Sequence, residues 1–285
     1  MMDTGIPIRG LEINVVYGCN LNCEYCTHFS KYLDGHVCAD EIAKWYATWH
    51  KRLIPQKVTV IGGEPLLHPE LPIILRLTRQ YWNRSELQMI TNGLLLSNQS
   101  EEVLTALLET NTLVTISRHT KRPEFTERQA AGTRLLKKYG IRYEIRLIYK
   151  WLKSYRLEDS GKILPYSSDA SKAWNNCFVK HQCMTLMNNA IYKCPQLACF
   201  SYAFNEGRLG EEWRFLLNYS PLTPEASEEQ IREFIREKPA FECRICPEQF
   251  DCVTETEKFP DKKPQNLLPR QAKSVQPSLL LVPLG

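Results

Sequence analysis

The residues best placed to do chemistry are three cysteines, Cys19, Cys23 and Cys26, spaced C-x3-C-x2-C directly after the strand-like run from Leu11 to Tyr17. Iron–sulfur clusters are held by cysteine thiolates, usually four of them. Three thiolates from one tight loop can hold three irons of a cubane cluster and leave the fourth iron open. Taken alone, the loop also suits part of a zinc site or three ordinary reduced thiols.

This loop resembles the signature of the radical SAM superfamily. In that family S-adenosylmethionine (SAM) caps the open iron, and one electron cleaves it to a 5′-deoxyadenosyl radical. Gly62-Gly63-Glu64-Pro65, at the end of a strand-like run, matches the GGEP motif of the same family. The resemblance implies that the glycines let the backbone approach the methionine amino group and that Glu64 receives this ammonium. By itself the motif also suits a plain turn.

Alternating strands and helices supply the context for both motifs. Strands are predicted at 57–61, 87–91, 113–117 and 141–149, and helices at 40–53, 70–82, 101–109 and 124–139. This alternation indicates an α/β fold with a parallel sheet. Together with the resemblance, it predicts a partial (β/α)6 radical SAM barrel over residues 1–165, a small Cys-rich C-terminal module over 166–253 and a tail over 254–285.

Polar residues follow several of the predicted strands, where functional side chains of such barrels sit. The resemblance implies contacts with SAM for Tyr25, Thr91, Asn92, Ser117, Arg118 and Arg146. The tyrosine would lie near the adenine. The two arginines are candidates for the carboxylate because a guanidinium binds it bidentately. Surface turns and solvated strand-end charges explain the same residues nearly as well.

Seven of the eleven cysteines lie in the C-terminal third: Cys177, Cys183, Cys194, Cys199, Cys243, Cys246 and Cys252. Between the second and third of them the sequence predicts a β-hairpin with its turn at Asn188-Asn189, and a polar helix follows near 227–238. A cysteine pair around a hairpin, then a helix, then C-x2-C resembles the SPASM and Twitch auxiliary-cluster domains of radical SAM enzymes. The pattern departs from SPASM at Thr256, where a fourth cysteine is absent.

The resemblance therefore implies one auxiliary 4Fe-4S cluster, with Cys177, Cys194, Cys243 and Cys246 as preferred ligands and Cys183 as the substitute for Cys177. Four thiolates in two pairs also suit a structural zinc ion, and unligated thiols are a third reading. Cys38 lies outside both groups and is expected to be a small buried hydrophobic residue.

Composition agrees with a soluble catalyst, since 43% of the residues are hydrophobic and 24% are charged. No apolar run approaches the ~20 residues of a membrane span, and the first residues lack the features of a signal peptide. A net charge of +4 gives no strong footprint for nucleic acid. Eleven cysteines without a secretion signal favour a reducing, cytoplasmic location and metal chemistry.

The resemblance implies an oxidoreductase that cleaves SAM reductively and abstracts a hydrogen atom from a small polar metabolite, such as an aminocyclitol or sugar. An electron donor such as flavodoxin or ferredoxin would be its partner. The alternatives are a radical epimerase, with Cys252 or Cys199 as hydrogen donor, and a modifier of a ribosomally made peptide. The expected cofactors are SAM, its 4Fe-4S cluster and the second 4Fe-4S cluster.

Overall fold

The computed structural model describes residues 5–149, 151–177, 179–180, 183–205, 207 and 209–254. Almost all of the tail expected over 254–285 therefore lies outside the described residues. Among the described residues, no helix is long and apolar enough to cross a membrane.

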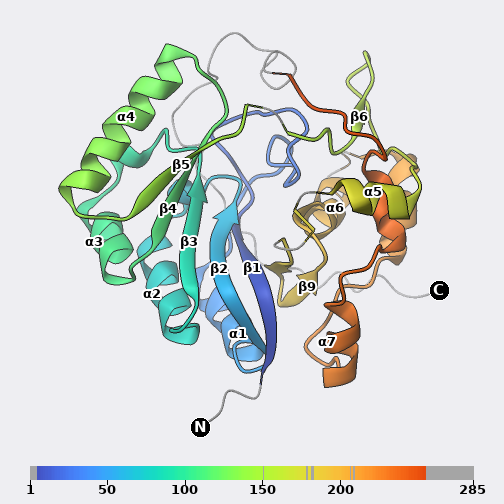
Figure 1. Ribbon diagram of the computed structural model, residues 1–285, viewed down its shortest axis with the longest axis horizontal. Coiled ribbons are helices and arrows are strands. Elements are labelled where there is room, and N and C mark those ends of the chain that lie inside the picture. Colours follow the sequence, from blue (N-terminus) through green and yellow to red (C-terminus); the bar gives the residue numbers. More distant parts are fainter. Residues whose placement is uncertain are drawn as a thin grey trace.

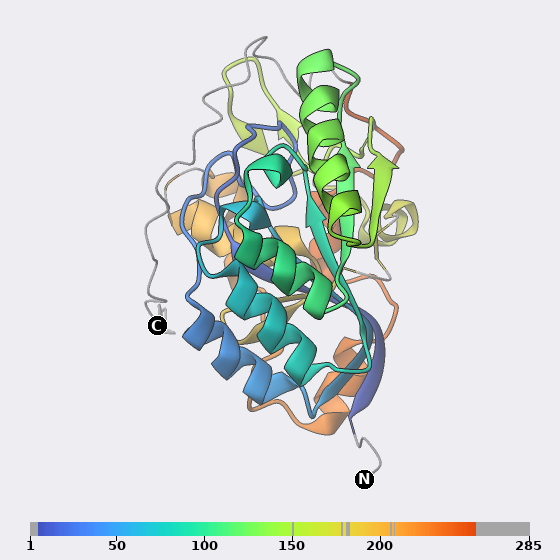
Figure 2. The same ribbon diagram turned by 90° about the vertical axis from the view of Figure 1, so that its left-hand side faces the viewer.

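The first half of the chain alternates strands and helices, as predicted. The elements are β1 (Ile6–Val16), α1 (Ala39–Trp49), β2 (Leu53–Gly62), α2 (Leu71–Tyr81), β3 (Glu86–Thr91), α3 (Glu101–Glu109), β4 (Leu113–Arg118), α4 (Pro123–Lys138) and β5 (Tyr143–Leu147). Neighbouring strands in this series pair in parallel. The four helices lie side by side over one face of the sheet (Figure 2), so the predicted α/β class and partial barrel are confirmed.

The apolar periodicity explains why these segments form a buried layer. Ile42, Trp45, Tyr46 and Trp49 recur on one face of α1, and each is completely buried. Fully burying a side chain of this kind is worth about 1.5–3 kcal/mol or more. The start of α3 is fixed by Ser100, whose hydroxyl accepts a hydrogen bond from the Val103 N–H and so satisfies a helix-end donor.

The strand order of the main sheet is β5-β4-β3-β2-β1-β8-β9. The strands β8 (Thr185–Met187) and β9 (Ala190–Tyr192) form the predicted antiparallel hairpin, and its turn residues Asn188 and Asn189 have φ of 51° and 56°. Strand β8 pairs in parallel with β1. A sixth parallel strand of the sheet therefore comes from the segment that the sequence assigns to the C-terminal module.

The remaining elements lie beyond β1, away from β5 (Figure 1). They are β6 (Arg156–Leu157), β7 (Ile163–Leu164), α5 (Ala170–Asn176), α6 (Pro195–Asn205) and α7 (Glu228–Phe234), with 3₁₀ segments at Glu211–Asn218 and Phe241–Ile245. Two further 3₁₀ segments, Pro65–Leu67 and Leu96–Asn98, belong to the barrel half. A capping box between Ser227 and Gln230 begins α7. The helix expected near 227–238 is therefore present but shorter.

Candidate functional site

The cysteine loop leaves β1 and is clamped by a segment distant in sequence. The Tyr25 N–H donates to the Tyr155 hydroxyl (2.6 Å), and the Ser154 hydroxyl donates to the Tyr25 carbonyl (3.0 Å). The rings of Tyr25 and Tyr155 stack with centroids 5.0 Å apart. Tyr25 has a φ of 60°, a left-handed conformation that a non-glycine residue adopts at a cost and keeps when its surroundings fix it. The loop therefore has a defined shape next to Cys26.

The two glycines of the GGEP motif allow β2 to end against this loop. A Cβ on Gly63 would lie 2.0 Å from the Gly18 carbonyl oxygen, and one on Gly62 would lie 2.1 Å from the Val16 carbonyl oxygen. The Gly63 N–H donates to that Val16 oxygen (2.8 Å). The close approach that requires glycine here is thus to the protein's own backbone, whereas the sequence led us to expect an approach to SAM.

Glu64 is completely buried, and its carboxylate is held by protein groups. It accepts hydrogen bonds from the Thr91 hydroxyl (2.6 Å), the Asn92 N–H (2.8 Å) and the Leu66 N–H (3.1 Å). Burial raises the pKa of Glu64 to about 7, although these bonds act in the opposite direction. Its position supports a role in joining the ends of β2 and β3 more directly than contact with the SAM ammonium.

Cys19 has two nitrogen donors close to its sulfur. The Leu21 N–H lies 3.4 Å from Cys19 Sγ, and Asn92 Nδ2 lies 3.8 Å from it. Burial raises the pKa of the Cys19 thiol well above its usual value, and the nearby Glu64 and Cys23 raise it further. Burial thus opposes a free thiolate at this position, and the two N–H groups suit a metal-bound sulfur.

One cavity of about 360 Å³ brings the two groups of cysteines together. From the loop it is lined by Cys19, Cys23 and Cys26, and from the C-terminal segment by Cys177, Cys183, Cys194 and Cys246. Parallel strands place their carboxyl ends at the same edge of a sheet, and this edge opens on the cavity. The site therefore lies between the barrel strands and the C-terminal elements.

Most of the residues expected to contact SAM line this cavity: Tyr25, Gly62, Gly63, Thr91, Asn92, Ser117 and Arg146. The described lining does not include Glu64, Pro65 or Arg118. Arg118 donates instead to Gln129 Oε1 on α4 (2.9 Å), whereas Arg146 pairs with Glu144 (2.7 Å). Of the two arginines, Arg146 is thus the one placed to meet a bound carboxylate.

The C-terminal thiols come from three separate segments. Cys177 ends α5, Cys194 precedes α6, and Cys243 and Cys246 belong to the turn at 241–246. The Ser168 N–H donates to the Arg244 carbonyl (2.9 Å) and so ties the first of these segments to the third.

These thiols are close enough to influence one another's ionisation. Burial raises the pKa of Cys194 to about 12, and Cys177 and Cys243 add to the rise. Burial also raises the pKa of Cys246, with smaller contributions from the other three. The four preferred ligands are thus near enough to affect one another's pKa, although Cys243 is not part of the described cavity lining. Cys183, the substitute ligand, also lines the cavity and is influenced by Cys194 and Cys177.

Within the described ranges, no three His, Cys, Asp or Glu side chains are arranged to hold a single metal ion. A cubane cluster binds each thiolate to a different iron, so its ligand sulfurs lie farther apart than those of one zinc ion. The loop supplies three thiols for three irons, and N–H donors lie beside the sulfur of Cys19. The cavity leaves room at the fourth iron, so the site fits a cluster with an open iron.

Three other cysteines lie elsewhere. Cys199 is 1% exposed and accepts a hydrogen bond from Asn14 Nδ2 (3.2 Å) in the core beside β1. Cys252 pairs with Leu152 in an isolated bridge. Neither belongs to the described lining of the cavity, which counts against the hydrogen-donor role expected for them. Cys38 is exposed just before α1, so the expectation of a buried residue is wrong there, because its neighbours Val37 and Ala39 face the core instead.

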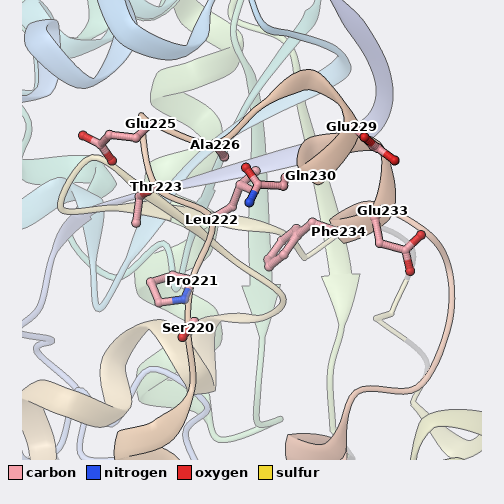
Figure 3. A pocket seen from close by; sticks show the side chains of 10 residues that line it. All are labelled: Ser220, Pro221, Leu222, Thr223, Glu225, Ala226, Glu229, Gln230, Glu233 and Phe234. Atoms are coloured by element: carbon pink, nitrogen blue, oxygen red, sulfur yellow. The ribbon is translucent and has the colours of Figure 1, made fainter. Parts of the chain in front are cut away.

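Sequence reasoning missed Glu12, which lines the cavity from the middle of β1. The signal was present, since an acid stands between the apolar residues Leu11 and Ile13 of the predicted strand. A larger hollow of about 600 Å³ lies between the segment 220–226 and α7 (Figure 3). Its charged side chains are three glutamates, Glu225, Glu229 and Glu233, and no thiol lines it. The thiols and the expected SAM contacts line the cavity of about 360 Å³, so we assign the candidate site to that smaller cavity.

Residues 13–156, about half of the chain, match the profile of the radical SAM superfamily. The chain belongs to this superfamily, whose members use a 4Fe-4S cluster and SAM.

Among curated relatives, a probable GTP 3′,8-cyclase of Methanococcus aeolicus is 32% identical over 138 residues, covering 47% of this chain and 45% of that protein. A GTP 3′,8-cyclase of Staphylococcus aureus is 31% identical over 110 residues, covering 36% of this chain and 32% of that protein. The chain thus matches less than half the length of these relatives.

Solved structures are similar at low identity. BtrN in complex with AdoMet and 2-DOIA has a TM-score of 0.46 and 16% identity, covering 90% of this chain and 98% of that one. The anSMEcpe structure with AdoMet and a Cp18Cys peptide has a TM-score of 0.39 and 23% identity, covering 49% and 42%. Streptococcus suis SuiB bound to S-adenosylmethionine has a TM-score of 0.42 and 15% identity, covering 52% of this chain and 35% of that one. These likenesses carry no argument about the substrate.

Proposed function

We propose that this radical SAM protein is an oxidoreductase that binds a small polar metabolite, such as an aminocyclitol or sugar, between a barrel over residues 1–165 and a Twitch-like module over 166–253. The observation that carries the proposal is the single cavity lined by both groups of cysteines. A substrate held there lies between a site that generates a radical and a site that can accept an electron.

The loop thiols Cys19, Cys23 and Cys26 would hold the first cluster. When bound, that cluster and SAM supply a carbon-centred radical that can take a hydrogen atom from a C–H bond. The chain's own contribution is positional: Asn92 and the Leu21 N–H face the Cys19 sulfur, and Arg146, which pairs with Glu144, lines the cavity where the SAM carboxylate would bind. The apolar walls around these groups keep water from a reactive intermediate.

Cys177, Cys194, Cys243 and Cys246 would hold a second 4Fe-4S cluster, and their mutual effect on pKa supports this set. The chemistry it would supply is acceptance of one electron. An alcohol carbon that loses a hydrogen atom, then one electron and one proton, becomes a carbonyl. The two losses together are a two-electron oxidation, with the proton passing to solvent or to a cavity side chain.

Epimerisation is the second candidate, and Cys183 is the observation that favours it. If the four preferred ligands hold the second cluster, Cys183 is a remaining thiol on the described cavity wall, and it is 3% exposed. A thiol there could return a hydrogen atom to the opposite face of the substrate. The match to a protein named probable GTP 3′,8-cyclase covers 47% of this chain and 45% of that protein, so we base no proposal about the substrate on it.

We further propose that the partner is a reducing flavodoxin or ferredoxin and that the protein works in the cytoplasm on a small molecule, without nucleic acid or membrane. Modification of a ribosomal peptide is the remaining alternative.

Turnover in deuterated water separates oxidation from epimerisation once a substrate is found. Oxidation predicts a product two hydrogens lighter, with no deuterium at the reacting carbon, and continued activity of Cys183→Ala. Deuterium at that carbon, together with lost activity of Cys183→Ala at full iron content, would replace the oxidoreductase proposal with an epimerase. Cys199→Ala and Cys252→Ala serve as controls, because neither residue belongs to the described cavity lining.

A further inference from the structure

A row of polar side chains crosses the sheet at the level of Glu12. Thr59 pairs with Glu12 in register, and its hydroxyl donates to Gln88 Oε1 (3.2 Å). Gln88 Nε2 donates to the Thr115 hydroxyl (2.6 Å), and that hydroxyl donates to Glu144 Oε1 (2.8 Å). From β2 to β5, each of these side chains is therefore satisfied by its neighbour.

Glu12 is the exception in this row. Its Oε2 atom is buried and has no hydrogen-bond partner among the described residues, although its residue lines the cavity. A carboxylate removed from water is costly unless a cation or hydrogen-bond donor meets it. Without such a partner the Glu12 side chain keeps its proton, because burial raises its pKa to about 8, and a cation bound in the cavity would let it ionise.

Three basic side chains belong to the described lining of the cavity, namely His28, His119 and Arg146, and burial lowers the pKa of His28 to about 4. Among the described lining residues, Arg146 is the single lysine or arginine, and it pairs with Glu144 (2.7 Å). The positive charge that would complement Glu12 must then come from a ligand.

The position of Glu12 favours substrate over SAM as this ligand. The Glu12 N–H donates to the Met184 carbonyl (2.8 Å), and Glu12 pairs in register with Thr185 of β8. Val16 ends the strand four residues later, about 13 Å farther on at strand rise, and the cysteine loop begins only beyond it. Glu12 thus belongs to the part of the cavity wall beside the C-terminal hairpin.

We propose that Glu12 binds an ammonium group of the substrate, so that the enzyme acts on a small, polar primary amine. This inference rests on the proposed function for the location of the substrate and deepens it by naming the charged group recognised. Because the same cavity of about 360 Å³ also takes SAM in the proposed function, the part left beside Glu12 favours a small amine.

The test is a binding measurement on the anaerobically reconstituted holoenzyme with matched pairs of probes. Glucosamine is compared with glucose, and 2-aminocyclohexanol with cyclohexane-1,2-diol, so that each pair differs in an amine against a hydroxyl. Wild type should bind each amine about tenfold more tightly than its neutral counterpart, the usual scale of a charge-assisted contact. Glu12→Gln should bind both members of each pair equally.

Glu229→Gln is the matched control, since it removes a carboxylate from the hollow of Figure 3 and should keep the preference for the amine. If Glu12→Gln does not fold, Glu12→Asp decides, because it retains a carboxylate and should retain at least a threefold preference. Equal binding of amine and alcohol to wild type, or a preference that survives in Glu12→Gln, would overturn the inference.

Formation of 5′-deoxyadenosine by wild type is measured in parallel. An enzyme that prefers the amine but cleaves no SAM would contradict the proposed function while leaving the role of Glu12 intact. An enzyme that cleaves SAM but binds amine and alcohol equally would support the proposed function and overturn the role of Glu12.

Discussion

The hydroxyl of Thr91 donates a 2.6 Å hydrogen bond to the carboxylate of Glu64, across the gap between the end of β3 and the end of β2. The same carboxylate also holds the Asn92 N–H. Thr91 and Asn92 both line the cavity, and Asn92 Nδ2 reaches Cys19 Sγ. Glu64 therefore connects the GGEP turn with the residues beside Cys19.

Replacing Glu64 with Gln should weaken SAM cleavage by about tenfold or more while leaving iron content intact. The amide removes the charge that accepts three hydrogen bonds and turns one N–H toward a backbone donor, which costs about 1.4 kcal/mol or more. The rate of 5′-deoxyadenosine formation by the reduced protein measures this. Thr91→Val, which removes one of the three donors, should give a smaller loss. An unchanged rate of 5′-deoxyadenosine formation in Glu64→Gln would mean that the GGEP motif is a plain turn without a role in SAM cleavage.

Gly63→Ala should prevent the cysteine loop from reaching its place, because the new Cβ would meet the Gly18 carbonyl oxygen at 2.0 Å. We expect poor folding or loss of the loop's iron, read as soluble yield and iron content after reconstitution. Gly140→Ala is the control: it has a positive φ of 69° but nothing within 4 Å of the new methyl group, so it should cost only about 1 kcal/mol. Equal behaviour of the two variants would contradict the steric explanation.

Glu12 should make stability depend on pH. Burial raises its pKa from 4.5 to about 8, so between these values the folded protein holds a proton that the unfolded chain has released. The stability of wild type should therefore fall, relative to Glu12→Gln, as pH rises through this window, by up to about 1.4 kcal/mol per unit. Urea unfolding of both proteins at pH 5, 6.5 and 8 measures the difference. A difference that stays constant over this range would show that Glu12 is ionised or solvated throughout.

Much of the barrel could be predicted because its signals are local. The apolar spacing in α1 and the strand-then-helix alternation identify the elements, and parallel pairing then brings Gly62, Thr91 and Ser117 to one edge. The hairpin turn at Asn188-Asn189 was also readable, since asparagine tolerates the left-handed conformation that such a turn requires.

The features that could not be predicted from the sequence depend on contacts between distant segments. Nothing near β8 indicates that it pairs with β1, because that pairing joins Glu12 to Thr185 across most of the chain. The hydrogen bonds of Glu64 are likewise set by tertiary structure. Both Cys183 and Cys199 are buried, and which of them lines the cavity depends on how α6 packs, which spacing alone does not specify.

Reconstituted wild type should contain about eight iron atoms per chain, as two 4Fe-4S clusters require. The triple variant of Cys19, Cys23 and Cys26 to Ala should retain about four, and so should the matched triple variant of Cys177, Cys194 and Cys246 to Ala. Iron and sulfide analysis measures both. A loop variant without any cluster would mean that the C-terminal thiols are not an iron–sulfur site, and zinc would then become the leading alternative for them.

The most direct test of the central claim is the formation of 5′-deoxyadenosine when the anaerobically reconstituted, reduced protein is given SAM. If Cys19, Cys23 and Cys26 hold the cluster that activates SAM, wild type forms 5′-deoxyadenosine and the triple alanine variant of these residues forms none. The triple variant of the C-terminal thiols should still cleave SAM. No product from wild type with its iron content complete, or equal product from the loop variant, would contradict the assignment of this site.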